Sequence, residues 1–113
     1  MLTKELSERS INWLVRRIEF TKPVTIGSST IMALNENDVP DFYNPSANWA
    51  HGGPIIEREM IEIGAHEPNE IEWVARDYWK EYQMTGPTPL IAAMRCYIAS
   101  KMGYEIEIPK ELK

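Results

Sequence analysis

The chain is poor in the residues that build disulfide-linked or metal-stabilised folds. It has one cysteine, Cys96, so no disulfide can form within it, and a reducing compartment is implied. Its two histidines, His51 and His66, have no second histidine, cysteine or carboxylate at a recognised ligand spacing. We therefore expect neither a metal site nor a cofactor. Cys96 lies in an apolar run and should belong to the core.

The sequence also lacks long apolar runs and an excess of positive charge. No stretch approaches the roughly 18 apolar residues of a membrane span, and no signal-peptide segment opens the chain, so we expect a soluble, cytoplasmic protein without a membrane partner. With 12 basic and 17 acidic residues the net charge is -5, which disfavours general attraction to nucleic acid. Arg16 and Arg17 are better explained by the C-terminal end of a helix than by phosphate contacts.

What is present is an ordinary globular composition, with 43% hydrophobic and 26% charged residues in a chain of 113. That length is typical of one domain, which buries about two-thirds of the surface of its unfolded chain. We therefore expect a single domain over residues 1–113, folding alone or as a small homo-oligomer.

The N-terminal part predicts a helix followed by a hairpin. Ser7 or Thr3 can cap a helix whose apolar residues recur at the i, i+3, i+4, i+7 spacing of a core-facing stripe. The stripe consists of Ile11, Leu14, Val15 and Ile18. A second, smaller apolar strip consists of Leu2, Leu6 and Trp13. Residues 23–34 alternate around a Gly-Ser-Ser break and predict two short strands.

A long irregular passage covers residues 35–50. It is dense in turn formers, and loops of this length inside compact domains are usually functional or disordered. The aromatic residues Phe42, Tyr43 and Trp49 argue against disorder. We therefore expect a long ordered central loop.

The next segment predicts a short helix and a second hairpin. Pro54 fits the first turn of the helix. Strands around residues 61–63 and 71–78 are expected to pair antiparallel. Residues 83–89, QMTGPTP, are typical of a turn.

The strongest predicted helix follows this turn. Thr88 fits its N-cap, Pro89 its first position, and Gly103 its end. Residues 104–109 then predict a final strand. The predicted fold class is α+β, with a small antiparallel sheet packed against an N-terminal and a C-terminal helix.

Arg95 lies on the last helix, near the seam between a large apolar face and a face of small residues. A guanidinium on a buried helix costs free energy unless it meets an anion or reaches solvent. One interpretation is a salt bridge to a carboxylate, or a side chain that extends to solvent. The other is an anion clamp in a pocket, assisted by the free N–H groups at the Thr88 end of the helix.

The segment NPSANWAHGGPIIERE, residues 44–59, has the composition of a ligand site. Two adjacent glycines allow close backbone approach, and a tryptophan beside a histidine can stack a ring and orient it. The alternative is that Trp49 fills the core under a long loop. The candidate ligand-binding residues are Ser46, Trp49, His51, Gly52, Gly53, Arg58, Thr88 and Arg95. None is assigned a catalytic role, because no activating triad is readable.

Two blocks, NPSANWAHGGPIIERE and GPTPLIAAMRCYIASKMGYEIEIP, closely resemble the NinX family of small accessory proteins of tailed bacteriophages and prophages. The shared pattern is a Pro-Ser-x-x-Trp-x-x-Gly-Gly-Pro loop, followed by a Thr-Pro-Leu-Ile-Ala-Ala-Met-Arg helix that ends in a glycine. The matching positions are Pro45, Ser46, Trp49, Gly52, Gly53, Pro54, Thr88, Pro89, Leu90, Arg95 and Gly103. The resemblance implies a phage origin and a location in the host bacterial cytoplasm, not a mechanism.

We expect the diglycine corner and the start of the last helix to meet around a cleft. The cleft would bind a small anionic, nucleotide-like ligand in a non-enzymatic phage accessory protein that counters host defence. One alternative is an adaptor or inhibitor that binds a host protein through the second apolar strip and an acidic rim. A less favoured one is a small hydrolase or transferase that uses His51 with Glu57 or Glu59.

Overall fold

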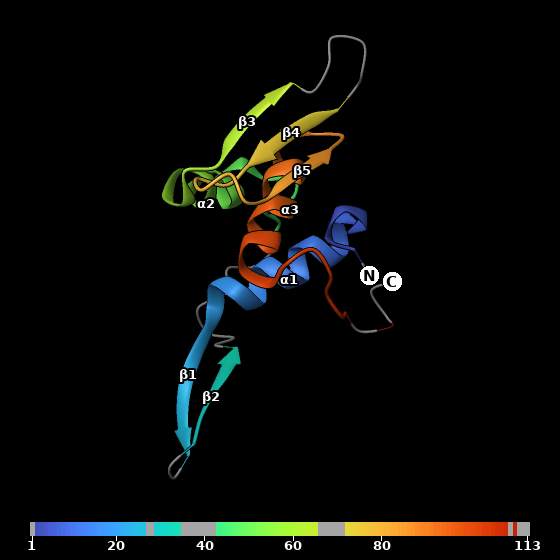
Figure 1. Ribbon diagram of the computed structural model, residues 1–113. Coiled ribbons are helices and arrows are strands. Elements are labelled where there is room, and N and C mark those ends of the chain that lie inside the picture. Colours follow the sequence, from blue (N-terminus) through green and yellow to red (C-terminus); the bar gives the residue numbers. More distant parts are fainter. Residues whose placement is uncertain (1, 27–28, 35–42, 66–71, 109, 111–113) are drawn as a thin grey trace.

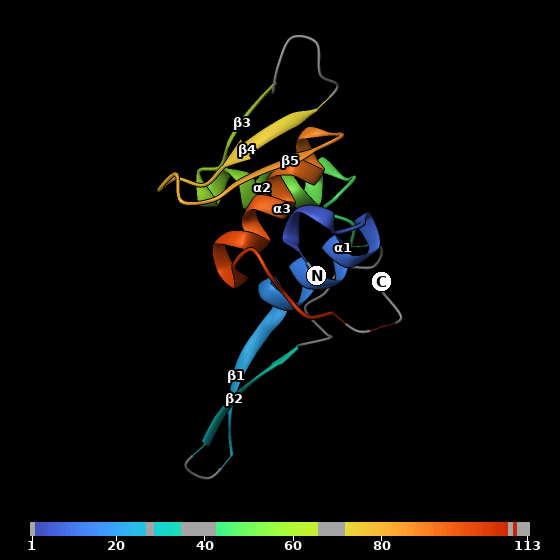
Figure 2. The same cartoon turned by 45° about the vertical axis from the view of Figure 1, so that its right-hand side comes forward.

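The computed structural model describes residues 2–26, 29–34, 43–65, 72–108 and 110. It confirms an α+β fold (Figures 1 and 2). The elements in chain order are the 3-10 turn η1 (Thr3–Glu5), α1 (Glu8–Phe20), β1 (Thr21–Ile26), β2 (Ser29–Leu34), α2 (Trp49–Glu59), β3 (Glu62–Ala65), β4 (Trp73–Arg76), β5 (Gln83–Gly86) and α3 (Pro89–Met102).

The last helix, α3, is the centre of the fold. The three-stranded sheet packs on it, and α1 and α2 contact it from other sides (Figures 1 and 2). Nine of its 14 residues are buried, including Cys96. A helix that is apolar on two sides is stable only between layers, as the sequence predicts for this segment.

Both ends of α3 are capped as predicted. The Thr88 hydroxyl accepts a hydrogen bond from the Ile91 N–H at 3.1 Å, and Pro89 occupies the first helical position. At the other end Gly103 has a φ of 90°, and its N–H donates to the Ala99 carbonyl. These contacts satisfy backbone groups that the helix leaves unpaired, so the bounds of α3 follow from local chemistry.

The first helix, α1, is capped by Ser7, one of the two residues predicted for this position. The Ser10 N–H donates to the Ser7 hydroxyl at 3.3 Å, and the stripe of apolar residues faces the core. The second apolar strip, in contrast, does not form one exposed patch. Leu6 is 0% exposed, Leu2 is 37% exposed, and Trp13 is half-buried beneath the Arg17 guanidinium. The prediction that Leu2, Leu6 and Trp13 form one exposed patch for a host protein is therefore wrong.

The strands form two separate antiparallel sheets. β1 and β2 pair from Thr21↔Leu34 to Ile26↔Ser29, which confirms the predicted hairpin. This hairpin projects from the end of α1, away from the body of the molecule (Figures 1 and 2). The other sheet has the order β3-β4-β5, and its β3–β4 pairing confirms the second hairpin.

The prediction of a turn over residues 83–89 is wrong for its first four residues, which form β5. They pair with β4 in the register Ala75↔Met84 and pack against α3. The segment has little intrinsic strand preference, so tertiary contacts decide its structure. Gly86 allows a close approach to α3, because a Cβ atom there would lie 2.8 Å from the Ala92 nitrogen.

The second helix, α2, begins at Trp49 and not at Pro54. Asn48 is its N-cap, and the Asn48 side chain accepts a hydrogen bond from the Ala50 N–H at 2.9 Å. The two adjacent glycines are helical residues, and neither has a positive φ. Glycine costs about 1 kcal/mol relative to alanine within a helix, which is why the sequence pattern favoured a corner here.

The predicted final strand is also wrong. Within residues 103–108, which the structure describes, the chain forms one isolated β-bridge, Leu2↔Glu105, and no strand. The Thr3 N–H donates to the Tyr104 carbonyl at 2.8 Å, and the Thr3 hydroxyl donates to the Gly103 carbonyl at 2.7 Å. The N-terminal segment is therefore fastened beside the end of α3. His66, the turn at 66–71 and loop residues 35–42 lie outside the described residues.

Candidate functional site

The segment that begins α2 is tied to α1 by an internal network of polar side chains. The Asn44 carboxamide oxygen accepts hydrogen bonds from the Asn12 amide at 2.8 Å and the Ser46 hydroxyl at 3.2 Å. The Ser46 N–H donates to the Asn12 side chain at 3.0 Å. The Asn44 N–H donates to Nδ1 of His51, whose ring stacks on Tyr43. Two candidate ligand-binding residues, Ser46 and His51, thus hold their own loop in place.

Gly52 brings this loop against the start of α3, as the sequence predicts, but by direct packing. A Cβ atom at Gly52 would lie 2.6 Å from the Leu90 side chain and 2.7 Å from the Pro45 carbonyl oxygen. Gly53, in contrast, has no atom within 4 Å of the position of its missing Cβ. Trp49, at the first turn of α2, is 54% exposed and does not fill the core.

Arg58 joins the ends of the three helices. Its guanidinium donates to both carboxylate oxygens of Glu19, at 2.9 and 2.7 Å, and to Glu59 at 3.1 Å. The Tyr97 hydroxyl donates to the same Glu19 carboxylate. Lys101 completes the group by pairing with Glu59 at 2.9 Å. These contacts link α1, α2 and α3 through paired charges and give Arg58 an internal partner.

The charges in this group shift one another's proton affinity. Burial alone would raise the pKa of Glu19, but hydrogen bonds from Arg58 and Tyr97 outweigh it and hold that pKa below its usual value. Burial and the hydrogen bond to Glu19 raise the pKa of Tyr97. Glu19 is therefore charged and Tyr97 neutral at physiological pH.

Arg95 binds backbone carbonyl groups on two different segments. Its Nε and one terminal nitrogen donate to the Leu6 carbonyl, at 3.2 and 2.8 Å, and the other terminal nitrogen donates to the Thr85 carbonyl at 2.8 Å. Burial lowers the pKa of Arg95. The planar guanidinium can satisfy both oxygens at once. Arg95 thus fastens the segment before α1 to the edge strand β5.

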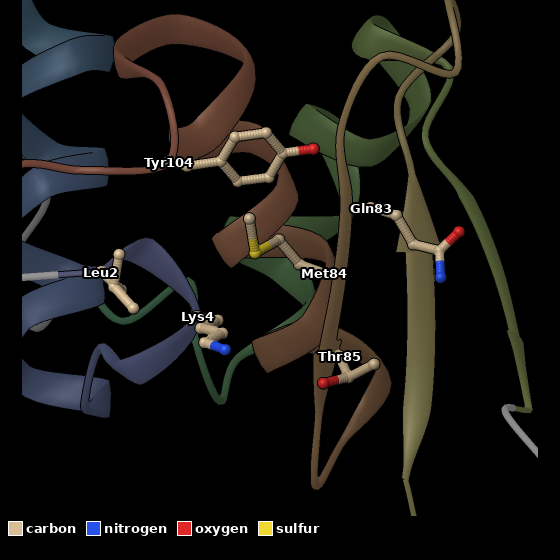
Figure 3. Close-up of a pocket in the computed structure, with 6 residues that line it drawn as sticks. All are labelled: Leu2, Lys4, Gln83, Met84, Thr85 and Tyr104. Atoms are coloured by element: carbon tan, nitrogen blue, oxygen red, sulfur yellow. The ribbon is translucent and has the colours of Figure 1, made fainter.

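The two segments that Arg95 joins are the walls of a hollow of about 370 Å³ (Figure 3). This volume lies within the roughly 300–1,000 Å³ range of small-molecule sites. One wall comes from the N-terminal segment and the chain after α3, and the other wall is β5. The lining residues are Leu2, Lys4, Gln83, Met84, Thr85 and Tyr104.

The apolar part of the hollow is formed by Leu2, Met84 and Tyr104, whose side chains occupy the space between the walls (Figure 3). Met84 is almost fully buried and forms the floor, whereas Leu2 and Tyr104 are partly exposed at the rim. The Tyr104 ring is held at its far end, because its hydroxyl donates to the Glu81 carbonyl at 3.0 Å. An aromatic face fixed beside an apolar floor is suited to a flat or aliphatic group.

The polar part of the hollow is formed by Lys4 and Thr85. Their side chains lie toward the same end of the hollow, away from Tyr104, and Gln83 points to the other side of β5 (Figure 3). The Gln83 carboxamide accepts a hydrogen bond from Arg76 at 2.9 Å. One cation and one hydroxyl at the end of an apolar hollow can hold a single anionic group.

None of the eight predicted ligand-binding residues lines this hollow. Arg95 contacts the walls of the hollow only through its hydrogen bonds to the Leu6 and Thr85 carbonyl groups. The lining residues were missed because the hollow exists only where the two chain ends meet β5. The one signal in the sequence was Leu2, which belongs to the second apolar strip of the N-terminal segment.

The sequence matches the protein family described as bacteriophage P22, NinX, over residues 3–101. The chain belongs to this family. It is therefore a phage accessory protein. The matched region contains the Asn44 network, Arg95 and β5. No curated protein matches the chain.

Two features of the described residues bear on the kind of site. None of the helices within them has the length and apolar character needed to cross a membrane. The same residues contain no group of three or more histidine, cysteine, aspartate or glutamate side chains arranged to hold a metal ion.

Proposed function

We propose that this NinX protein binds a small anionic, nucleotide-like ligand in the hollow between the N-terminal segment and β5. The ring or apolar body would lie against Tyr104 and Met84, and the anionic group would meet Lys4 and Thr85. Sequestration of a nucleotide signal of host defence is the physiological role that such binding would serve.

The observation that carries this proposal is the segregation of the hollow into an apolar end and a cationic end (Figure 3). Ligand sites typically combine an apolar lining with a few polar groups that fix orientation. Here Met84 and Tyr104 provide the apolar lining, and Lys4 provides a polar group that can fix the orientation of the ligand. Arg95 does not line the hollow, but it holds the β5 wall in place by donating to the Thr85 backbone carbonyl.

The chemistry of the lining favours binding over catalysis. None of the six described residues that line the hollow is a carboxylate, a histidine or a cysteine. General acid–base catalysis needs a group that exchanges a proton near neutral pH, and nucleophilic catalysis needs an activated side chain. A non-enzymatic role therefore agrees best with the residues that meet the hollow.

A thermal-shift and calorimetric screen tests the proposal. The probes are nucleoside monophosphates, cyclic dinucleotides, the free nucleosides and inorganic phosphate. A ligand that binds only the folded state raises the melting temperature by mass action. We expect a shift with at least one nucleotide and none with the nucleoside that lacks its phosphate.

Three variants locate the site. Lys4→Gln and Tyr104→Ala should each weaken binding by about 10-fold or more, because each removes one interaction worth about 1.4 kcal/mol. Trp49→Ala should bind as the parent protein does, although Trp49 is the aromatic residue of the cleft predicted from sequence. Binding lost in Trp49→Ala and kept in the other two would place the ligand at α2. No shift with any probe would reject the function itself.

A further inference from the structure

The loop between β4 and β5 presents two aromatic side chains to solvent in a fixed arrangement. Trp79 is 76% exposed and Tyr78 is more than half exposed, and the two rings meet edge to face with centroids 5.0 Å apart. Exposed indole and phenol rings are enriched at protein interfaces, where they supply most of the binding free energy. Their exposure here therefore needs an explanation beyond folding.

The loop that carries these rings is closed at its base by hydrogen bonds. The Asp77 N–H donates to the Tyr82 carbonyl at 3.2 Å, and the Asp77 carboxylate accepts from the Tyr82 N–H at 2.9 Å. Lys80 adopts a left-handed conformation with φ 61° and pairs with Glu62 on β3. A surface that is ordered before binding loses little entropy when a partner docks.

Beside the rings is a second hollow, of about 240 Å³, between this loop and the C-terminal ends of α2 and α3. Its charged lining residues are Glu59, Asp77, Glu81 and Lys101. Lys101, the one cation among the described residues of this lining, is paired with Glu59 at 2.9 Å. The remaining two carboxylates give the hollow a negative charge, in a chain whose net charge is already -5. Met60, at the end of α2, adds a third exposed apolar side chain.

We propose that this surface docks a protein segment that carries an arginine or lysine next to an apolar residue. The cation would enter the hollow between the carboxylates of Asp77 and Glu81 and contact the face of Trp79, which is the arrangement of a cation–π interaction. The apolar neighbour would lie on Tyr78 and Met60. Charge complementarity selects this occupant, because the carboxylates repel phosphate groups and anionic lipid.

A carbohydrate is the main rival occupant, because sugars also stack on tryptophan beside carboxylates. The geometry favours a protein segment. The Tyr78 and Trp79 rings are nearly perpendicular, at 84°, so they offer no continuous flat platform for a sugar. This surface also differs from the first hollow, since the two share no lining residue.

Selection from a display library of random short peptides tests the proposal, with the Trp79→Ala protein as the counter-selection. Enriched peptides should contain arginine or lysine beside an apolar residue, and they are then titrated by fluorescence anisotropy. Replacement of that arginine or lysine by glutamine should weaken binding by about 10-fold, in line with a desolvated cation–π contact. Higher salt should weaken binding as well, because the contact is partly electrostatic.

The protein variants complete the test. Trp79→Ala and Glu81→Gln should each weaken peptide binding while leaving the melting temperature nearly unchanged, because both side chains are exposed. Trp49→Ala is the matched control, since it removes an exposed indole elsewhere on the surface. The proposal is overturned if no peptide is enriched, if the enriched peptides lack a basic residue, or if Trp79→Ala binds them equally. A glycan that binds the parent protein and not Trp79→Ala, without any peptide, would also overturn it.

Discussion

The guanidinium of Arg95 donates two hydrogen bonds to the carbonyl oxygen of Leu6, a residue 89 positions earlier in the chain. A third hydrogen bond reaches Thr85 on β5. The arginine that the sequence presents as an anion clamp or a salt-bridge partner is thus a brace between two backbone segments. The hollow lies between the two segments that this brace connects.

Replacement of Arg95 should destabilise the fold and the hollow together. Arg95→Leu leaves two carbonyl oxygens without their donors, which should cost about 2–4 kcal/mol of the free energy of unfolding. Arg95→Lys should lose less than Arg95→Leu, because its ammonium group can still donate to one of the two oxygens, although it cannot span both. Urea unfolding measures both values. Arg76→Lys, which alters one exposed hydrogen bond to Gln83, is the control and should lose less than about 1 kcal/mol. Equal losses in all three would refute the brace.

The adjacent glycines of α2 should respond in opposite directions to alanine. Gly52→Ala places a methyl group within 2.7 Å of a backbone oxygen and should cost about 1–3 kcal/mol of stability through overpacking. Gly53→Ala meets open space in a helix and should stabilise the protein by about 0.5–1 kcal/mol. Thermal unfolding of the two variants, side by side, gives the comparison. A flexible corner at this position would instead make both substitutions unfavourable.

Acid should weaken the contact between Glu19 and Arg58. The pKa of Glu19 is lowered in the folded protein, so its contribution is present above the unfolded pKa and is lost as the pH falls through the folded value. Glu19→Gln should therefore be less stable than the parent protein at neutral pH. The difference should begin to shrink as the pH falls below about 4.3, the ordinary pKa of a glutamate in the unfolded chain, and it should be lost once the pH has fallen through the lower pKa of Glu19 in the folded protein. Urea titrations over a pH series measure this difference, and a gap that does not change with pH would contradict the assignment.

Cys96 should resist alkylation while the protein is folded. Burial raises the pKa of Cys96 to about 12, and its Sγ lies 3.8 Å from the Tyr82 carbonyl oxygen. Since the thiolate is the reactive form, iodoacetamide at mildly alkaline pH should modify the folded protein at least about 100-fold more slowly than the urea-unfolded chain. Mass spectrometry of timed samples gives both rates. Similar rates would show that the core opens far more often than its packing implies.

The sequence by itself determined the features that depend on neighbours one helical turn away. The Ser7 cap with its apolar stripe and the Thr88–Pro89 start of α3 are of this kind, because caps and periodicity act over about four residues. The two hairpins and the NinX family were recognisable for the same reason, from short ordered patterns.

The tertiary structure alone decided the rest. The tertiary contacts determine the partners of Arg95, the strand β5, the helical state of Gly52 and the hollow beside Tyr104, because each depends on packing between separate elements of the fold. No local pattern encodes such a meeting, because the hydrogen bonds and packing that stabilise it exist only after the core has formed.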